Sequence, residues 1–314
     1  MTHARAERQS GFALLAVLWV IVGLAALGVA TSLAARNAII AAGNRVDIAR
    51  ATWRAADCLE RARASVADVL HAPPERDARG LSGWSGLEAR VPSALIVSGA
   101  HCDVRLEAVG SRIDVNSADG EMIGALLHRL GIPDAMRDSM VDALLDWRDA
   151  DDVPRPHGAE RQWYAASGRF TPRNGPFADV REIARVRGFE KLHGLDSLLS
   201  VEPGRVSLAL APLSVLAALP GIGEEALSRV AEQRARGAGS GDLMELTAEL
   251  SPGARQRVLA RYSELVHAAT SEPDAWILEA RATTGSPAIT VVIQVRLVRA
   301  GDRAAIVRRR TWIA

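Results

Sequence analysis

The length, composition and charge of the chain set the first limits on what it can be. Its 314 residues are 48% apolar and 24% charged, which suffices for roughly two globular units with a sizeable core. The 38 basic and 37 acidic side chains leave a formal net charge of +1. Proteins that bind duplex nucleic acid carry a basic excess or stripe that replaces counterions on the phosphates. The overall charge therefore argues against that class.

A membrane anchor is predicted near the start of the chain. Residues 1–11 are polar, and residues 12–35 contain no charged side chain before Arg36. About 20 apolar residues are enough to cross the hydrocarbon of a bilayer as a helix. We therefore predict a transmembrane helix over 12–35, with the short polar flank in the cytoplasm and the bulk of the chain on the other side. The alternative is a buried core helix.

The helical pattern continues beyond this predicted anchor. Residues 36–70 hold apolar side chains near helical spacing among charged ones, with no proline and with Gly43 as the only glycine. Pro73 and Pro74 then break the pattern. The sequence predicts one helix over 12–70, apolar at its start and amphipathic later.

The two cysteines, Cys58 and Cys102, have no metal-ligand neighbour at short spacing. Export would place them in an oxidising compartment, where a disulfide can form. That bridge would close a loop of about 45 residues and stabilise the fold by up to roughly 4 kcal/mol. Alternatively, two unpaired cysteines pack as small hydrophobes. The sequence leaves both alternatives open.

Strands are predicted in two parts of the chain. Residues 71–99, rich in Pro, Gly and Ser, are predicted to form a loop region. Alternating apolar residues over 102–116, with a turn at Gly110, predict a β-hairpin. Three further strands, which should complete a sheet with that hairpin, are predicted over 276–283, 288–298 and 304–312.

Two helix-hairpin-helix units are predicted between these strands, over 116–150 and 207–238. The helices of the first unit are predicted over 119–131 and 134–148. In DNA-binding versions of this motif, hairpin amides and a helix N-terminus hold a phosphate. Here Glu224 and Glu225 directly follow the second hairpin and would repel a phosphate. Nucleic acid is therefore not an expected ligand.

An acidic loop is the candidate metal site of the sequence. Five carboxylates lie close together along the chain: Asp146, Asp149, Asp151, Asp152 and Glu160. Hard cations such as Ca²⁺ take six to eight oxygen ligands, and calcium would relieve the repulsion between these groups. The loop is not an EF-hand, because Pro154 stands where that motif needs glycine. Salt bridges from the arginines of the loop are the alternative to calcium: Arg148, Arg155 and Arg161.

Two segments resemble the type II secretion minor pseudopilin K family, within the type IV pilin-like superfamily. A polar leader that ends in Gly11 and is followed by Phe12 and a long apolar helix is similar to a prepilin. The stretch 146–190 carries unusual residues in the order of the family, among them Trp147, Pro154, Pro156, Tyr164, Asn174, Pro176 and Phe177.

The resemblance implies an α+β fold in which a pilin-like long N-terminal helix packs on an antiparallel sheet, with a large all-helical domain inserted between strands. The implied parts are a prepilin leader (1–11), a transmembrane and a periplasmic part of the helix (12–35 and 36–70), a loop with the first strands (71–116), the inserted helical domain (117–272) and the last strands (273–314).

The resemblance also implies processing and a place in a filament. The prepilin peptidase would cut between Gly11 and Phe12 and methylate the new N-terminus. The family usually has a glutamate where this chain has Ala16. A carboxylate in hydrocarbon costs several kcal/mol unless it is paired, and a subunit at the filament tip has no subunit above it to supply the partner. Ala16 therefore marks a tip position; alternatively it is an ordinary small residue facing lipid.

The implied function is that of a minor pseudopilin at the tip of the type II secretion pseudopilus, which initiates or caps assembly and supports export of folded proteins across the outer membrane. The implied partners are the I and J minor pseudopilins, the inner-membrane secretion platform and membrane lipid, and the implied location is the bacterial inner membrane with a periplasmic body. The sequence contains no HExxH, GxSxG, P-loop or CxxC motif, and we predict no enzyme. The alternative function is a membrane-tethered helix-hairpin-helix protein of DNA uptake.

Overall fold

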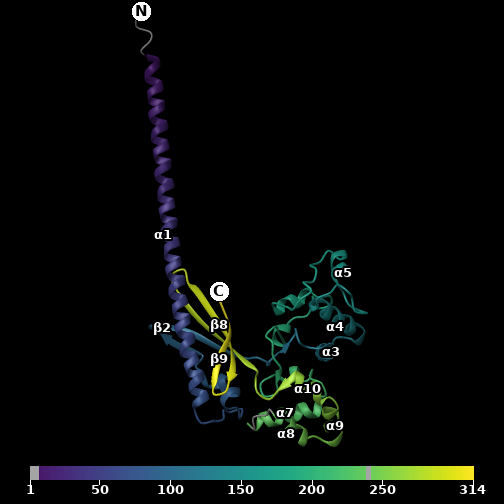
Figure 1. The fold of residues 1–314 in the computed structure, drawn as a ribbon. Coiled ribbons are helices and arrows are strands. Elements are labelled where there is room, and N and C mark those ends of the chain that lie inside the picture. Colours follow the sequence, from purple (N-terminus) through teal and green to yellow (C-terminus); the bar gives the residue numbers. More distant parts are fainter. Residues whose placement is uncertain (1–6, 238–241) are drawn as a thin grey trace, which may run out of the picture.

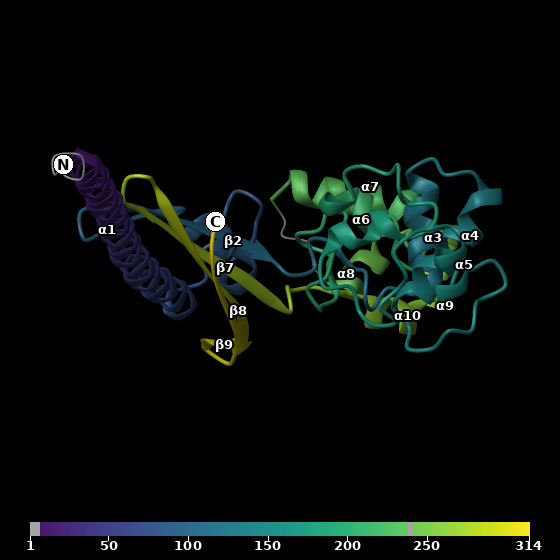
Figure 2. The ribbon, with the colours of Figure 1, turned by 90° about the horizontal axis from the view of Figure 1, so that it is seen from above.

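The computed structural model describes residues 7–237 and 242–314, and residues 7–11 by their backbone alone. Figures 1 and 2 show three parts: the long helix α1, a twisted sheet beside its lower end, and a helical body on the other side of the sheet. Residues 1–6 of the predicted leader lie outside the described residues.

Helix α1 runs from Glu7 to His71 without interruption. The predicted single helix over 12–70 is therefore confirmed, with a slightly earlier start. The apolar side chains of its first part are exposed, and the described residues contain one helix that is long and apolar enough to cross a membrane.

The last third of α1 packs on the sheet because its small and apolar residues share one helical face. These residues recur every three or four positions and are at most 1% exposed: Ala51, Ala55, Cys58, Leu59, Ala62 and Val66. They share a hydrophobic core with alternate residues of the sheet, among them Trp276, Leu278, Ile293 and Val295.

The sheet has five antiparallel strands in the order β1-β2-β7-β8-β9. They span Ala94–Val97 (β1), Ala100–Ala108 (β2), Ala275–Thr284 (β7), Ile289–Ala300 (β8) and Arg303–Ile313 (β9). The three predicted C-terminal strands are thus confirmed. The predicted loop region 71–99 holds strand β1 and two short helical segments, η1 (Gly83–Gly86) and α2 (Leu87–Arg90).

The predicted hairpin over 102–116 is wrong. Strand β2 forms its hairpin with the preceding strand β1, while the following strand β3 (Ile113–Asp114) pairs in parallel with β4 (Leu199–Ser200). The chain leaves the sheet at Gly110, which has a φ of +90°. A Cβ on Gly110 would lie 2.0 Å from the carbonyl oxygen of Arg205. This close backbone approach directs the chain into the helical body instead of back along β2.

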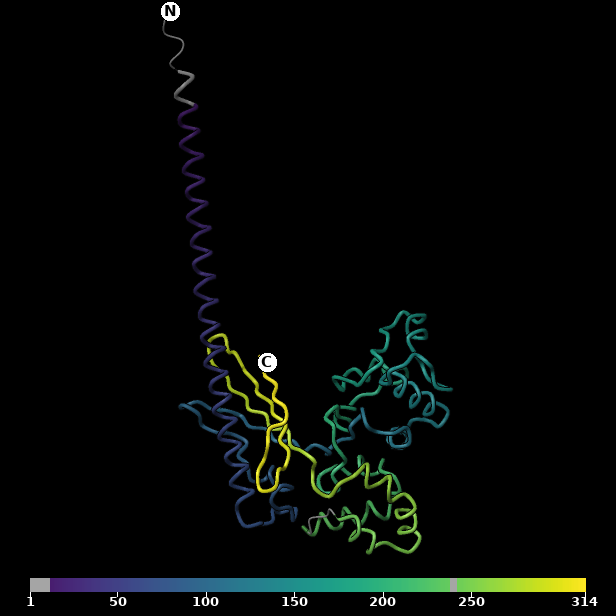
Figure 3. The backbone as a smooth tube through the Cα atoms, in the orientation of Figure 1, coloured from purple at the N-terminus to yellow at the C-terminus, as the bar shows by residue number. Residues whose placement is uncertain are grey.

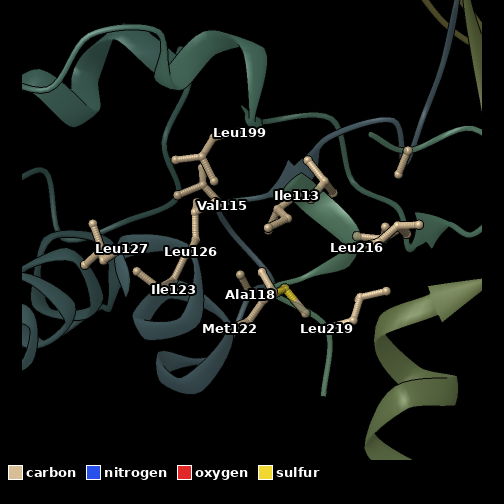
Figure 4. Packing of buried hydrophobic residues seen from close by; sticks show 14 of the residues in the cluster. Ile113, Val115, Ala118, Met122, Ile123, Leu126, Leu127, Leu199, Leu216 and Leu219 are labelled. Carbon is tan, nitrogen blue, oxygen red and sulfur yellow. The ribbon is translucent and has the colours of Figure 1, made fainter. Parts of the chain in front are cut away.

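The helical body lies between β2 and β7 in the chain and has its own core. Its α-helices are α3 (Gly120–Arg129), α4 (Asp134–Arg148), α5 (Arg161–Ala166), α6 (Leu213–Leu216), α7 (Glu224–Ala235), α8 (Leu243–Ala248), α9 (Pro252–Ala260) and α10 (Tyr262–Ala268). Figure 4 shows Ile123 and Leu126 of α3 packing towards Val115 and Leu199. The predicted α+β fold with an inserted helical domain is confirmed.

The insertion is not wholly helical, contrary to the prediction. Besides the 3₁₀ segments η2 (Val180–Arg185) and η3 (Leu195–Ser197), two small parallel sheets occur: β3 with β4, and β5 (Val206–Ser207) with β6 (Ala269–Thr270). These short pairings join segments far apart in the sequence, and two-residue strands give no period that a sequence pattern could reveal.

Both predicted helix-hairpin-helix units have the expected elements. In the first, α3 and α4 are joined through Gly131, which has a φ of +76°. In the second, α6 and α7 are joined through Gly221, with a φ of +73°. Residue 238, where the second predicted unit ends, lies outside the described residues.

The helical body is attached to the sheet by charged and aromatic contacts as well as by the two chain crossings seen in Figure 3. Glu202, in the loop between β4 and β5, forms ion pairs with Arg296 and Arg308 of the sheet. The indole nitrogen of buried Trp84 donates to the carbonyl oxygen of Pro273 at 2.7 Å. These contacts fix the point where the insertion returns to β7.

Candidate functional site

Three of the five predicted metal-site carboxylates come together at the start and end of the α4–α5 connection. Asp146 lies in the last turn of α4, Asp149 immediately follows α4, and Glu160 immediately precedes α5. Each offers an oxygen atom, and these atoms all lie within 4.8 Å of one another. The helix ends therefore gather carboxylates that the intervening loop separates in sequence.

Asp151 and Asp152, which the sequence also placed at the site, lie outside this group. Asp151 Oδ1 accepts from the backbone N–H of Val153 at 2.9 Å, a local turn contact. Asp152 is exposed and faces Arg161 at 3.4 Å. Both carboxylates belong to the surface of the loop, although their spacing in the sequence looks equally suited to metal binding.

Arg155 forms ion pairs with two of the three clustered carboxylates, Asp146 and Asp149. Its Nη1 lies 2.7 Å from Asp146 Oδ1 and 2.5 Å from Asp149 Oδ2. The side chain of Asp146 is fully buried. A Cβ on Gly158 would lie 1.8 Å from Asp146 Oδ2, so the backbone at Gly158 can approach the carboxylate only without a side chain.

Glu160 is the least satisfied group of the site. The residue is 4% exposed, and neither carboxylate oxygen has a hydrogen-bond partner among the described residues. Burial, and then the neighbouring charges of Asp146 and Asp149, raise the pKa of Glu160 to about 7. A buried carboxylate without a partner is costly, and either protonation or a bound cation would remove that cost.

Two further oxygen atoms at the same loop are buried without a partner among the described residues, Asp149 Oδ1 and Asn174 Oδ1. Asn174 reaches the loop through its amide nitrogen, which donates to Asp152 Oδ1 at 2.8 Å. Its backbone is left-handed, with a φ of +52°. No pattern in the sequence marks Asn174 as a ligand. The Asn-Gly pair at 174–175 indicates a turn but gives no sign that the oxygen is buried.

The donor set fits a hard divalent cation. The unpartnered atoms are all oxygens, the ligand type of Ca²⁺. Three ionised carboxylates and one guanidinium leave two negative charges, which a divalent ion would balance. Asp146, Asp149 and Glu160 would hold such an ion, with water completing the coordination shell.

The two cysteines lie in the other part of the molecule and are joined. Cys58 of α1 and Cys102 of β2 form a disulfide, with their Cα atoms 6.3 Å apart. Both residues are buried between the helix and the sheet. The bridge ties the last third of α1 covalently to the sheet on which it packs.

The predicted processing residues lie in the exposed first part of α1. Of Gly11 the structure describes only the helical backbone, whereas Phe12 is 78% exposed and Ala16 is also exposed. The proposed cleavage, the methylation and the meaning of Ala16 for filament position remain predictions.

At the second hairpin, within the described residues, two carboxylates occupy the helix N-terminus that binds a phosphate in DNA-binding versions of the motif. Glu224 at the start of α7 lies 2.5 Å from Arg129. Glu225 accepts hydrogen bonds from the backbone N–H and the hydroxyl group of Ser251, at 2.6 and 2.7 Å. Two carboxylates therefore stand where a phosphate would meet the helix N-terminus, and they hold the helices of this chain together.

Part of the chain matches a known protein family. Residues 105–196, which include α3, α4 and the acidic group, match the family described as type II secretion system (T2SS), protein K. This segment belongs to that family. The resemblance to the type II secretion minor pseudopilin K family is thereby confirmed. The family is a structural component of the secretion system.

A solved structure shows the same fold over most of the chain. The match is to a chain in the crystal structure of the GspK-GspI-GspJ complex from the enterotoxigenic Escherichia coli type 2 secretion system. It covers 86% of this chain and 98% of that chain, with a TM-score of 0.57 at 15% sequence identity. The search of curated proteins found no match.

Proposed function

We propose that this chain is a minor pseudopilin that occupies the tip of the type II secretion pseudopilus, where it initiates or caps assembly and supports export of folded proteins. The observation that carries the proposal is the protein K segment, residues 105–196, inserted into a pilin-like helix and sheet. The exposed apolar start of α1 would lie in the inner membrane, with the sheet and the helical body in the periplasm.

The proposed partners are the I and J minor pseudopilins, the rest of the pseudopilus and the secretion platform of the inner membrane. The similar solved structure is a complex of GspK with GspI and GspJ. Co-purification of the full chain with co-expressed I and J proteins tests this. Recovery of the chain without either protein, under conditions that retain the membrane, would contradict the proposal.

Processing by the prepilin peptidase is part of the same proposal. Cleavage between Gly11 and Phe12 would remove the polar leader and leave a methylated Phe12 at the start of α1. Mass spectrometry of the N-terminal peptide from membrane-extracted protein tests this directly. A mature protein that still begins with the first eleven residues would refute it.

The tip position is tested at Ala16. A tip subunit lacks the neighbour that would pair with a carboxylate here, so Ala16→Glu should place an unpaired charge in the membrane, at a cost of up to roughly 3.5 kcal/mol. We expect reduced assembly and secretion with Ala16→Glu and normal secretion with Ala16→Leu, the matched apolar variant. Full secretion by the glutamate variant would refute the tip assignment.

We further propose that calcium binds Asp146, Asp149 and Glu160 and stabilises the helical body. The supporting observation is that both oxygens of Glu160 are buried and unpartnered among the described residues. Calcium should raise the melting temperature of the full chain in detergent above that in chelator. Equal melting temperatures would end this proposal without affecting the secretion role.

The alternative, a tethered DNA-uptake protein, has no support at the second hairpin, where Glu224 and Glu225 are engaged with Arg129 and Ser251. An electrophoretic mobility shift assay with duplex DNA separates the two functions: tight, salt-sensitive binding would favour DNA uptake.

A further inference from the structure

Arg155 already gives the acidic group one positive charge. Its guanidinium bridges one oxygen of Asp146 and one of Asp149, at 2.7 and 2.5 Å, and its backbone N–H also faces Asp146 at 3.3 Å. The Arg155 side chain remains 37% exposed. It therefore reaches the buried carboxylates from the surface, as a cation would that enters from solvent.

The bridge leaves other oxygens of the same group free. Arg155 contacts Asp149 through Oδ2, whereas Asp149 Oδ1 and both oxygens of Glu160 are buried without a partner among the described residues. The guanidinium and a metal ion would thus use different atoms of shared carboxylates. Both can bind, but two positive charges on one set of ligands repel each other.

We propose that Arg155 is a resident counter-cation, which lets the helical body fold while the acidic group is free of metal and which weakens calcium binding there. This inference rests on the proposed calcium site. Without Arg155, the three neighbouring carboxylates would have no ion-pair partner among the described residues, so folding of the helical body would depend much more strongly on calcium. With Arg155 present, the helical body folds without calcium, and calcium only adds to its stability.

The coupling has a definite sign. Removing the guanidinium raises the free energy of the metal-free fold, because buried Asp146 loses its ion pair. The same substitution raises the free energy of the calcium-bound fold by less, because the ion still neutralises the carboxylates. Calcium must therefore bind Arg155→Gln more tightly than it binds the unsubstituted chain, by about tenfold, within the usual range of coupling between two sites.

The test compares calcium binding by three proteins, each the full chain in detergent at a pH above 7: the unsubstituted chain, Arg155→Gln and Arg161→Gln. Arg161 is the matched control, because it follows Glu160 at the start of α5 and, among the described residues, forms an ion pair only with exposed Asp152. Isothermal titration with calcium chloride gives the dissociation constants, and thermal melts in calcium and in chelator give the stabilities.

We expect Arg155→Gln to bind calcium about tenfold more tightly, to melt lower in chelator and to recover most of that loss in calcium. Arg161→Gln should match the unsubstituted chain in both measurements. Equal or weaker calcium binding by Arg155→Gln, beside normal binding by the unsubstituted chain, overturns the inference and leaves the calcium site standing. No binding by either protein overturns the calcium site, and the inference with it. Binding by Arg155→Gln alone supports the inference and shows that Arg155 excludes the metal from the native chain.

The variant remains informative if it unfolds in chelator. Refolding on addition of calcium supports the inference, and failure to refold overturns it. Arg155→Lys provides an independent measurement, since it keeps the charge and loses the planar fork. We expect Arg155→Lys to bind calcium about as tightly as the unsubstituted chain. If Arg155→Lys instead bound calcium more tightly, as expected for Arg155→Gln, the charge of Arg155 would not be the cause.

Discussion

Replacing Glu160 with glutamine should stabilise the metal-free protein at alkaline pH. Glu160 has a pKa of about 7 in the fold, raised from 4.5 mainly by burial. Below about pH 4 the residue is protonated in both states and costs nothing. As the pH rises from about 4 to 7, the unfolded chain releases its proton first, so the free energy of unfolding falls. Above pH 7 the full penalty remains.

The two pKa values bound the size of this penalty. The difference between 4.5 and about 7 corresponds to at most about 3.4 kcal/mol of unfolding free energy. Glutamine keeps the shape, removes the charge and can donate hydrogen bonds to Asp146 and Asp149, whose oxygens lie within 4.8 Å. For a body of this size the upper bound is a rise in melting temperature of roughly 7–14 °C.

The assay is thermal unfolding of the full chain in detergent and chelator, followed by circular dichroism at about pH 8 and about pH 5. We expect Glu160→Gln to melt higher than the unsubstituted chain at pH 8, and to show only about a quarter of that advantage at pH 5. Calcium should remove the advantage at pH 8, because glutamine gives the ion a neutral ligand. A variant that melts lower at pH 8, or that shifts equally at both pH values, would refute the argument from buried charge.

Three further predictions follow from contacts elsewhere in the chain. Replacing both Cys58 and Cys102 with alanine should lower the free energy of unfolding by about 4 kcal/mol relative to the chain with its disulfide intact. Denaturant titration measures the loss, and the unsubstituted chain in reductant is the control. A loss of under about 1 kcal/mol would contradict the loop-closure reasoning. Gly158→Ala should destabilise by about 2–3 kcal/mol, because its Cβ would lie 1.8 Å from a carboxylate oxygen, whereas the control Gly175→Ala meets nothing within 4 Å and should change little. Glu202→Gln should cost about 2 kcal/mol by leaving two arginines of the sheet without their carboxylate, and unchanged hydrogen exchange where the insertion returns to β7 would argue against it.

The parts of the fold that could be predicted are those with a long period. Helix α1 and strands β7, β8 and β9 each extend over ten or more residues. The apolar pattern along α1 and β8 is regular enough to specify both the element and its buried face. The predicted hairpin at Gly110 is wrong because a turn residue between two apolar runs does not reveal which strand each run pairs with. The pairing depends on a contact between residues far apart in the sequence, the close approach of the Arg205 carbonyl oxygen to Gly110.

The candidate site shows the same limit at the level of side chains. Composition and spacing identified the acidic loop, but Asp146 and Asp151 look alike in sequence and differ in the structure: one is buried beside Arg155 and the other caps a turn. Burial of Glu160 and the contact of Asn174 with the loop depend on how α4, α5 and the following loop pack. No local pattern contains that information.

The two parts of the molecule should respond separately to the two kinds of perturbation. The helix-and-sheet part and the helical body bury distinct cores, and the disulfide lies in the first while the acidic group lies in the second. Separate cores allow separate unfolding transitions. Calcium should therefore protect backbone amides around Asp146 from hydrogen exchange and leave those around Cys102 unchanged. Reduction of the disulfide should speed exchange of the amides around Cys102 and leave those around Asp146 unchanged. Protection that spread equally through both cores on adding calcium would mean that the Glu202 ion pairs couple them into one cooperative unit.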